Sequence, residues 1–124
     1  MFMSKLSVLI TGLLCFLAVS LSAQSVVGKW KYEFQTDQGT MVMSANIKAD
    51  GTYELDYGID GTVDVTGKYT ISGDEFTIQD ETGNCTGKGV YKVKVDETTM
   101  TMTLVSDECE GRGGPEGVMV SKRM

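Results

Sequence analysis

Residues 28–34 read Gly-Lys-Trp-Lys-Tyr-Glu-Phe, a stretch in which aromatic side chains alternate with charged ones. Successive side chains of a β-strand point to opposite faces, so this alternation is typical of a strand with one buried and one solvated face. A second alternation, from Met41 to Ile47, predicts a second strand of the same kind. From residue 24 onward no stretch has the period of an amphipathic helix, so the sequence predicts an all-β protein.

The same alternation recurs in six further segments, which brings the predicted number of strands to eight. Every aromatic residue from Trp30 onward falls on the phase that we expect to face inward. Random placement would scatter the aromatic residues over both faces, so this phase marks the expected core. The expected inward residues of the six segments are Tyr53, Leu55 and Tyr57; Val63, Val65, Tyr69 and Ile71; Phe76 and Ile78; Tyr91, Val93 and Val95; Met100, Met102 and Leu104; and Val118 and Val120.

The connections between these segments alternate in length along the chain. Short turns with hairpin chemistry are expected at residues 49–51, 72–74 and 96–99, and longer links at 35–40, 58–61, 80–89 and 106–115. In an up-and-down arrangement this alternation places all the short turns at one end and all the long links at the other. Closing eight antiparallel strands on themselves removes the exposed edges. We therefore expect an eight-stranded antiparallel up-and-down β-barrel with one closed and one open end.

Residues 1–23 have the pattern of a secretory signal peptide, because a single cation, Lys5, precedes an apolar run that ends in small residues. We expect a barrel domain over residues 24–124, secreted or periplasmic, with no membrane insertion after cleavage. Cys15 leaves with the signal; the alternative, a lipoprotein cysteine, is disfavoured because Leu14 stands where a small residue is needed. Cys85 and Cys109 then remain as an even pair in an oxidising compartment, which predicts a disulfide between them.

The net charge of the chain is −6 at pH 7, and loss of Lys5 with the signal makes the remainder more acidic. Such a charge repels nucleic acid and anionic lipid, so we expect neither as a partner. We interpret this acidity as a property that keeps the protein soluble outside the cell. The less favoured interpretation is a surface that binds cations. A monomer is expected.

The first strand opens with Gly28-Lys29-Trp30, and a Gly-x-Trp at this position resembles the signature of the lipocalin and calycin superfamily. The resemblance implies that Trp30 plugs the closed end of the barrel beneath a basic side chain from the end of the last strand. That strand ends in Lys122-Arg123, so a cation there is expected to lie on the ring. We assign Gly28, Trp30 and Lys122 to the closed end.

A second resemblance covers the C-terminal half of the chain. The motifs Gly67-Lys68-Tyr69 and Gly89-Val90-Tyr91, together with residues 102–112, look like small secreted bacterial lipocalin-like proteins. Those proteins carry one cysteine in each of two loops and an Asp-x-Cys-x-Gly-Arg segment, which Asp107 begins here. The resemblance implies a lipocalin-like fold with a disulfide between two loops, and it implies little about activity.

The strand phases predict which side chains surround the open end. This interior is expected to be either a filled core or a small pocket for an apolar molecule, with tyrosine hydroxyls as polar contacts. The leading functional hypothesis is the binding of a small hydrophobic or amphipathic molecule through the open end. The candidate ligand-binding residues at the pocket mouth are Phe34, Met41, Tyr57, Val63, Ile78, Tyr91, Leu104 and Arg112.

Three other groups of residues invite a functional interpretation. The methionines of two Met-x-Met pairs, at 41–43 and 100–102, are favoured as flexible core filling over Cu(I) ligands. Arg112 is expected to pair with Asp107 or a neighbouring acid, and the alternative is a clamp on a ligand carboxylate. A solvated acidic rim is favoured over a calcium site, because dedicated loop spacing is missing. The acidic residues of this rim are Asp37, Asp60, Asp80, Glu81, Asp107, Glu108 and Glu110.

The sequence contains no histidine, which removes the serine and cysteine triads and the histidine-ligated metal and haem sites. With both remaining cysteines oxidised, a thiolate nucleophile is also excluded. We therefore expect neither an enzyme nor a cofactor. The alternative function is a protein-interaction module with a filled core, similar to the periplasmic metalloprotease inhibitors that also begin with Gly-x-Trp. Residues 24–27 are short for the projecting N-terminal segment of such an inhibitor.

Overall fold

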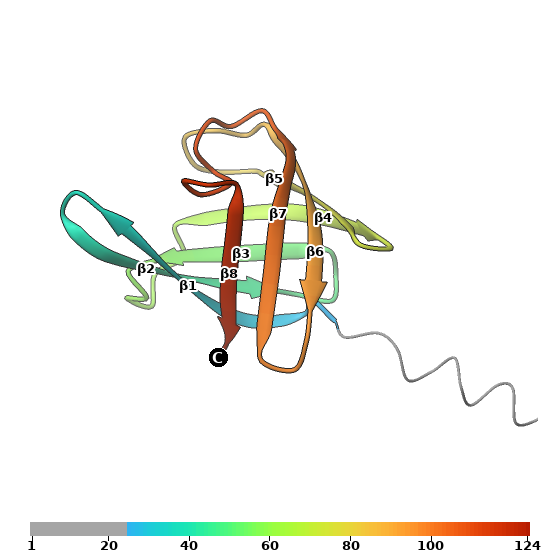
Figure 1. Ribbon diagram of the computed structural model, residues 1–124, viewed down its shortest axis with the longest axis horizontal. Coiled ribbons are helices and arrows are strands. Elements are labelled where there is room, and N and C mark those ends of the chain that lie inside the picture. Colours follow the sequence, from blue (N-terminus) through green and yellow to red (C-terminus); the bar gives the residue numbers. More distant parts are fainter. Residues whose placement is uncertain (1–24) are drawn as a thin grey trace, which may run out of the picture.

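The computed structural model describes residues 25–124, and the signal peptide expected over residues 1–23 lies outside this range. Each strand pairs antiparallel with the next, and the last pairs with the first, so the sheet closes into a barrel (Figure 1). The predicted all-β, eight-stranded, up-and-down barrel is confirmed, and no helix that could span a membrane occurs among residues 25–124. The strands are β1 (Gly28–Thr36), β2 (Gly39–Ile47), β3 (Thr52–Tyr57), β4 (Val65–Ser72), β5 (Glu75–Asp80), β6 (Lys88–Val95), β7 (Thr99–Asp107) and β8 (Val118–Arg123).

Three tight turns close one end of the barrel, as the sequence predicts. They join β2 to β3, β4 to β5 and β6 to β7. Short polar side chains fix two of them: Asp50 accepts a hydrogen bond from the backbone N–H of Thr52, and Asp96 accepts bonds from the N–H groups of Thr98 and Thr99. The links 58–64, 81–87 and 108–117 lie at the opposite, open end.

The first connection differs from the expected long link at 35–40. The pairing of β1 with β2 continues to Thr36 and Gly39, which leaves only Asp37 and Gln38 as a two-residue turn. Gly39 follows this turn and has a φ of 109°, a backbone conformation that residues with a side chain rarely adopt. The resulting hairpin projects beyond the barrel wall (Figure 1), and residues 35–41 at its tip are all exposed, so apolar alternation is not needed there. For that reason Met41, expected to face inward, is 42% exposed.

Trp30 plugs the closed end, where its side chain is only 1% exposed and its Nε1 donates a hydrogen bond to the carbonyl of Val26. The guanidinium carbon of Arg123 lies 4.1 Å from the centre of the indole ring. The assignment of Lys122 to this position is wrong. Trp30 pairs directly with Arg123 across the β1–β8 seam, so Arg123 shares the inward phase and Lys122 points to solvent. Gly28 has a φ of 140°, a backbone conformation that residues with a side chain rarely adopt, and a Cβ atom there would lie 2.8 Å from Nη1 of Arg123.

The pairing across this seam also shows that the inward face expected for β8 is wrong. Val118 and Val120 were expected to face inward, but they are 45% and 49% exposed. With Arg123 facing inward, Ser121 and Met119 fall on the inner face, where they pair with Met100 and Met102 of β7. A one-residue change in register exchanges the two faces of a strand, and closure of the barrel decides which face is inside.

Two residues of the β4 segment that were expected to face inward are also exposed. Val63 belongs to the link 58–64 rather than to β4 and is 46% exposed, and Ile71, near the closed-end turn, is 45% exposed.

Gly67, inside β4, gives room to the ring of Tyr53. A Cβ atom on Gly67 would lie 2.2 Å from Cζ of Tyr53, so only glycine lets this ring lie against the backbone of β4. The buried core comprises Val26, Trp30, Ile47, Tyr53, Phe76, Tyr91, Met100 and Met102.

We predict that Arg123→Gln destabilises the protein by about 1–2 kcal/mol, because it removes the cation from Trp30 and three hydrogen bonds to the carbonyls of Ser25, Val27 and Glu97. The matched variant Lys122→Gln is expected to change the free energy of unfolding by less than about 0.5 kcal/mol. Urea denaturation measures both. Equal effects of the two variants would contradict the assignment of Arg123 to the closed end.

Candidate ligand-binding site

The barrel encloses a cavity of about 620 Å³. Its inner part is apolar and is lined by residues of the closed end, among them Trp30, Ile47, Phe76 and Met100. Its outer part is lined by Tyr57 and by residues of the links 81–87 and 108–117, so it reaches the open end. Of the two interiors that the sequence allowed, the structure has a pocket rather than a completely filled core.

Four of the eight residues expected at the pocket mouth line this cavity: Phe34, Tyr57, Ile78 and Arg112. The other four do not. Met41, Val63 and Leu104 are 40–46% exposed, and Tyr91 is completely buried beside the cavity. Leu104 supports the link 108–117 instead, since its backbone N–H donates to the carbonyl of Gly117. That any of these residues binds a ligand stays a prediction.

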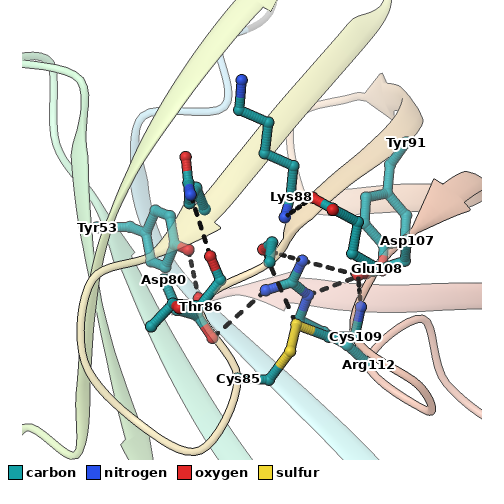
Figure 2. Close-up of a disulfide and its surroundings, with 12 residues drawn as sticks. Tyr53, Asp80, Cys85, Thr86, Lys88, Tyr91, Asp107, Glu108, Cys109 and Arg112 are labelled. Atoms are coloured by element: carbon teal, nitrogen blue, oxygen red, sulfur yellow. Dashed lines mark hydrogen bonds and ion pairs between the residues drawn. A yellow bond between two sulfur atoms is a disulfide. The ribbon is translucent and has the colours of Figure 1, made fainter.

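Arg112 is paired with Asp107, which is the local pairing that the sequence favours. Its Nε and Nη2 atoms donate to the two carboxylate oxygens at 2.9 and 2.7 Å, and Nη2 also donates to the carbonyl of Gly87 at 2.8 Å (Figure 2). A bidentate arrangement of this kind is the strongest geometry available to an arginine and a carboxylate. Arg112 thereby joins the end of β7 to the link 81–87.

Two tyrosines complete a polar network around Arg112 that is not predicted from the sequence. The hydroxyl of Tyr91 donates to Asp107, and the hydroxyl of Tyr53 donates to Oδ1 of Asp80. Oδ2 of Asp80 lies 3.5 Å from Nη1 of Arg112. Tyr53 and Asp80 are paired with the same residue, Gly67, on either side of β4, and only this sheet register brings them together.

Asp80 and Asp107 were expected in a solvated acidic rim, and for these two residues the expectation is wrong. The side chains are 11% and 4% exposed, respectively. Burial tends to raise the pKa of the Asp107 carboxyl, but the hydrogen bonds from Arg112, Tyr91 and the N–H of Cys109 outweigh it and lower the pKa below its usual value. Asp107 is therefore an internal anion that orients Arg112.

The two tyrosine hydroxyls of the network remain protonated at physiological pH. Burial raises the pKa of Tyr53, and the hydrogen bond to Asp80 raises it further. Burial and then the hydrogen bond to Asp107 raise the pKa of Tyr91 in the same way. Both phenols are thus fixed hydrogen-bond donors to their carboxylates.

The predicted disulfide between Cys85 and Cys109 is confirmed, and it joins the links 81–87 and 108–117 beside Arg112 (Figure 2). Both cysteines line the cavity. Next to the bridge, Lys88 at the start of β6 and Glu108 exchange a pair of hydrogen bonds, which also hold the link 108–117 in place. A disulfide is compatible with an extracellular or periplasmic location.

Three acidic residues gather in and beside the link 58–64: Asp56, Asp60 and Asp64, whose carboxylates lie within 4.8 Å of one another. Asp56 accepts hydrogen bonds from the backbone N–H groups of Asp60 and Gly61, and Asp64 accepts one from Tyr57. These bonds to the backbone account for the positions of the carboxylates, as is common in tight loops.

Comparisons with protein-family models, with curated proteins and with solved structures found no match for this chain.

We predict that replacing Cys85 and Cys109 together by serine destabilises the protein by about 3–4 kcal/mol, because the bridge closes a loop with a sequence separation of 24. Reduction of the unmodified protein should give the same urea midpoint as the double variant. An unchanged midpoint after loss of the bridge would show that the other contacts between the two links suffice.

The lowered pKa of Asp107 predicts a pH dependence of stability. Because the folded pKa is depressed below 3.8, this carboxylate stabilises the protein fully above its unfolded pKa, and the contribution is lost as the pH falls through the folded value. We therefore expect Asp107→Asn to be less stable at pH 7 and to lose less stability than the unmodified protein on acidification below about pH 4. The control is Asp74→Asn, at an exposed turn position. Parallel pH profiles of the Asp107 variant and the unmodified protein, measured by urea denaturation, would contradict this role.

Proposed function

We propose that this protein is a secreted lipocalin-like binding protein that holds a small hydrophobic or amphipathic molecule in the barrel. The observation that carries the proposal is the cavity of about 620 Å³, which reaches the open end. Cavities for small ligands usually have volumes of roughly 300–1,000 Å³, an apolar lining and a few polar groups. This cavity has each of these properties.

The lining favours an apolar ligand. Aromatic side chains contribute much of it, and burial of apolar area contributes roughly 25 cal/mol per Å² to binding before the costs of association. The closed barrel holds these side chains on strands rather than on loops, so little ordering is needed when a ligand enters. The aromatic residues of the lining are Trp30, Tyr32, Phe34, Tyr53, Tyr57 and Phe76.

Kinship with the lipocalin and calycin proteins, and with their small bacterial relatives, is part of this proposal. It is supported by the closed eight-stranded barrel and by Arg123 lying over the Trp30 of the Gly-x-Trp motif. The disulfide between Cys85 and Cys109 supports secretion or a periplasmic location, because such bonds persist in oxidising compartments.

A protein-interaction module is the second candidate, and one surface favours it. Val105, Val118 and Val120 are 45–56% exposed on the outside of β7 and β8. Exposed apolar side chains gathered on neighbouring strands are typical of contact surfaces. The test is recovery of a partner protein from the native host. Binding that is lost in the Val118→Thr and Val120→Thr variants, but retained in a variant with a filled cavity, would favour this candidate.

The cavity predicts a sharp difference between two alanine substitutions. Ala45 lines the cavity, whereas Ala49 lies exposed in the turn after β2. We expect Ala45→Leu to weaken binding of the neutral apolar dye N-phenyl-1-naphthylamine by about tenfold, since the added carbons occupy ligand volume, and Ala49→Leu to leave it unchanged. Dye fluorescence measures binding, and urea denaturation checks that both variants fold. Equal dye affinities in two folded variants would contradict binding inside the barrel.

A further inference from the structure

One carboxylate oxygen on the cavity wall, on a residue that is mostly buried, receives no hydrogen bond. Asp80 is only 9% exposed and lines the cavity. Its Oδ1 accepts the hydroxyl of Tyr53, but Oδ2 receives no hydrogen bond from the residues that the structure describes. The nearest cation to Oδ2 is Nη1 of Arg112 at 3.5 Å, which makes no hydrogen bond in this geometry. This oxygen can therefore accept a hydrogen bond from a donor on a molecule bound in the cavity.

The charges around the cavity are predominantly negative. Three carboxylates line it, those of Asp64, Asp80 and Glu110, against the single guanidinium of Arg112. That guanidinium is already neutralised by its bidentate pair with Asp107. A ligand therefore meets a net negative potential as it enters, in a chain that is itself acidic.

This arrangement opposes an anionic ligand. Nη1 of Arg112 is buried, so a ligand carboxylate could not reach it without displacing its neighbours. It would also approach Oδ2 of Asp80, because that oxygen lies 3.5 Å from Nη1. Juxtaposed like charges are unfavourable, most of all away from water. Of the two roles considered for Arg112, pairing with a neighbouring acid is thus favoured over a clamp on a ligand carboxylate.

We propose that the cavity selects an amphipathic molecule that carries a protonated amine, with the ammonium group at Oδ2 of Asp80 and the apolar part toward Trp30. The proposal rests on the function proposed above and specifies its ligand class. An ammonium supplies both the donor that Asp80 lacks and the positive charge that Asp64 and Glu110 attract. The aromatic walls add favourable contacts for a cation, since ring faces carry negative potential.

The test compares three ligands with the same ten-carbon tail: decylamine, decanol and decanoate. Each displaces N-phenyl-1-naphthylamine from residues 24–124, at pH 7 and low ionic strength, below micelle-forming concentrations. We expect decylamine to bind roughly tenfold more tightly than decanol, and decanoate to bind most weakly. Added salt should reduce the preference for the amine over the alcohol.

Variants locate the source of the preference. Asp80→Asn should reduce the preference for amine over alcohol by roughly tenfold, since the neutral amide can still accept from Tyr53. Glu110→Gln should reduce it by about two- to threefold. The control is Glu116→Gln, which removes the same charge from an exposed position of the same link outside the lining, and it should leave the preference unchanged. Decanol affinity reports in every variant whether the cavity is intact.

The outcomes separate this proposal from the one on which it rests. If decanol or decanoate binds as tightly as decylamine, the inferred charge selection is wrong while ligand binding stands. If Asp80→Asn keeps both its decanol affinity and its amine preference, Asp80 is not the site of the ammonium group. If none of the three ligands displaces the dye and the dye itself does not bind, the proposed function is wrong.

Discussion

Closure of the sheet between β1 and β8 is the constraint on which the rest of the molecule depends. The pairing of Trp30 with Arg123 fixes which face of β8 is inside, and it places the guanidinium on the indole ring. A barrel has no edge strands, so an error in this register would affect the lining of the whole interior. With one end plugged in this way, the interior can be entered only from the other end.

The opposite end is held by covalent and ionic cross-links. The disulfide joins the links 81–87 and 108–117, and Arg112 ties both to the end of β7 through Asp107 and Gly87. Cross-links of this kind order long links without filling the space beneath them with side chains. They are therefore suited to an interior that has to remain accessible, which is why we connect this end with binding.

The alternating pattern of residues predicted the fold because strand phase is a local property. It predicted seven of the eight strand phases correctly and missed that of β8, where valines alternate with a methionine and a serine and pattern alone favours the wrong face. It also missed the pairing of Tyr53 with Asp80 across Gly67. These contacts depend on sheet register and barrel closure, which a single sequence does not specify. The glycine itself, inside a strand, was the available signal of a close approach.

Ligand binding is tested most directly by native mass spectrometry of the protein purified from its own host, compared with its mass after denaturation. We expect a stoichiometric adduct that is present in the native spectrum and absent after denaturation, with the mass of a small amphipathic molecule. Identical bare masses in the two spectra, from protein that was never exposed to detergent or organic solvent, would contradict the view that the barrel is a ligand carrier.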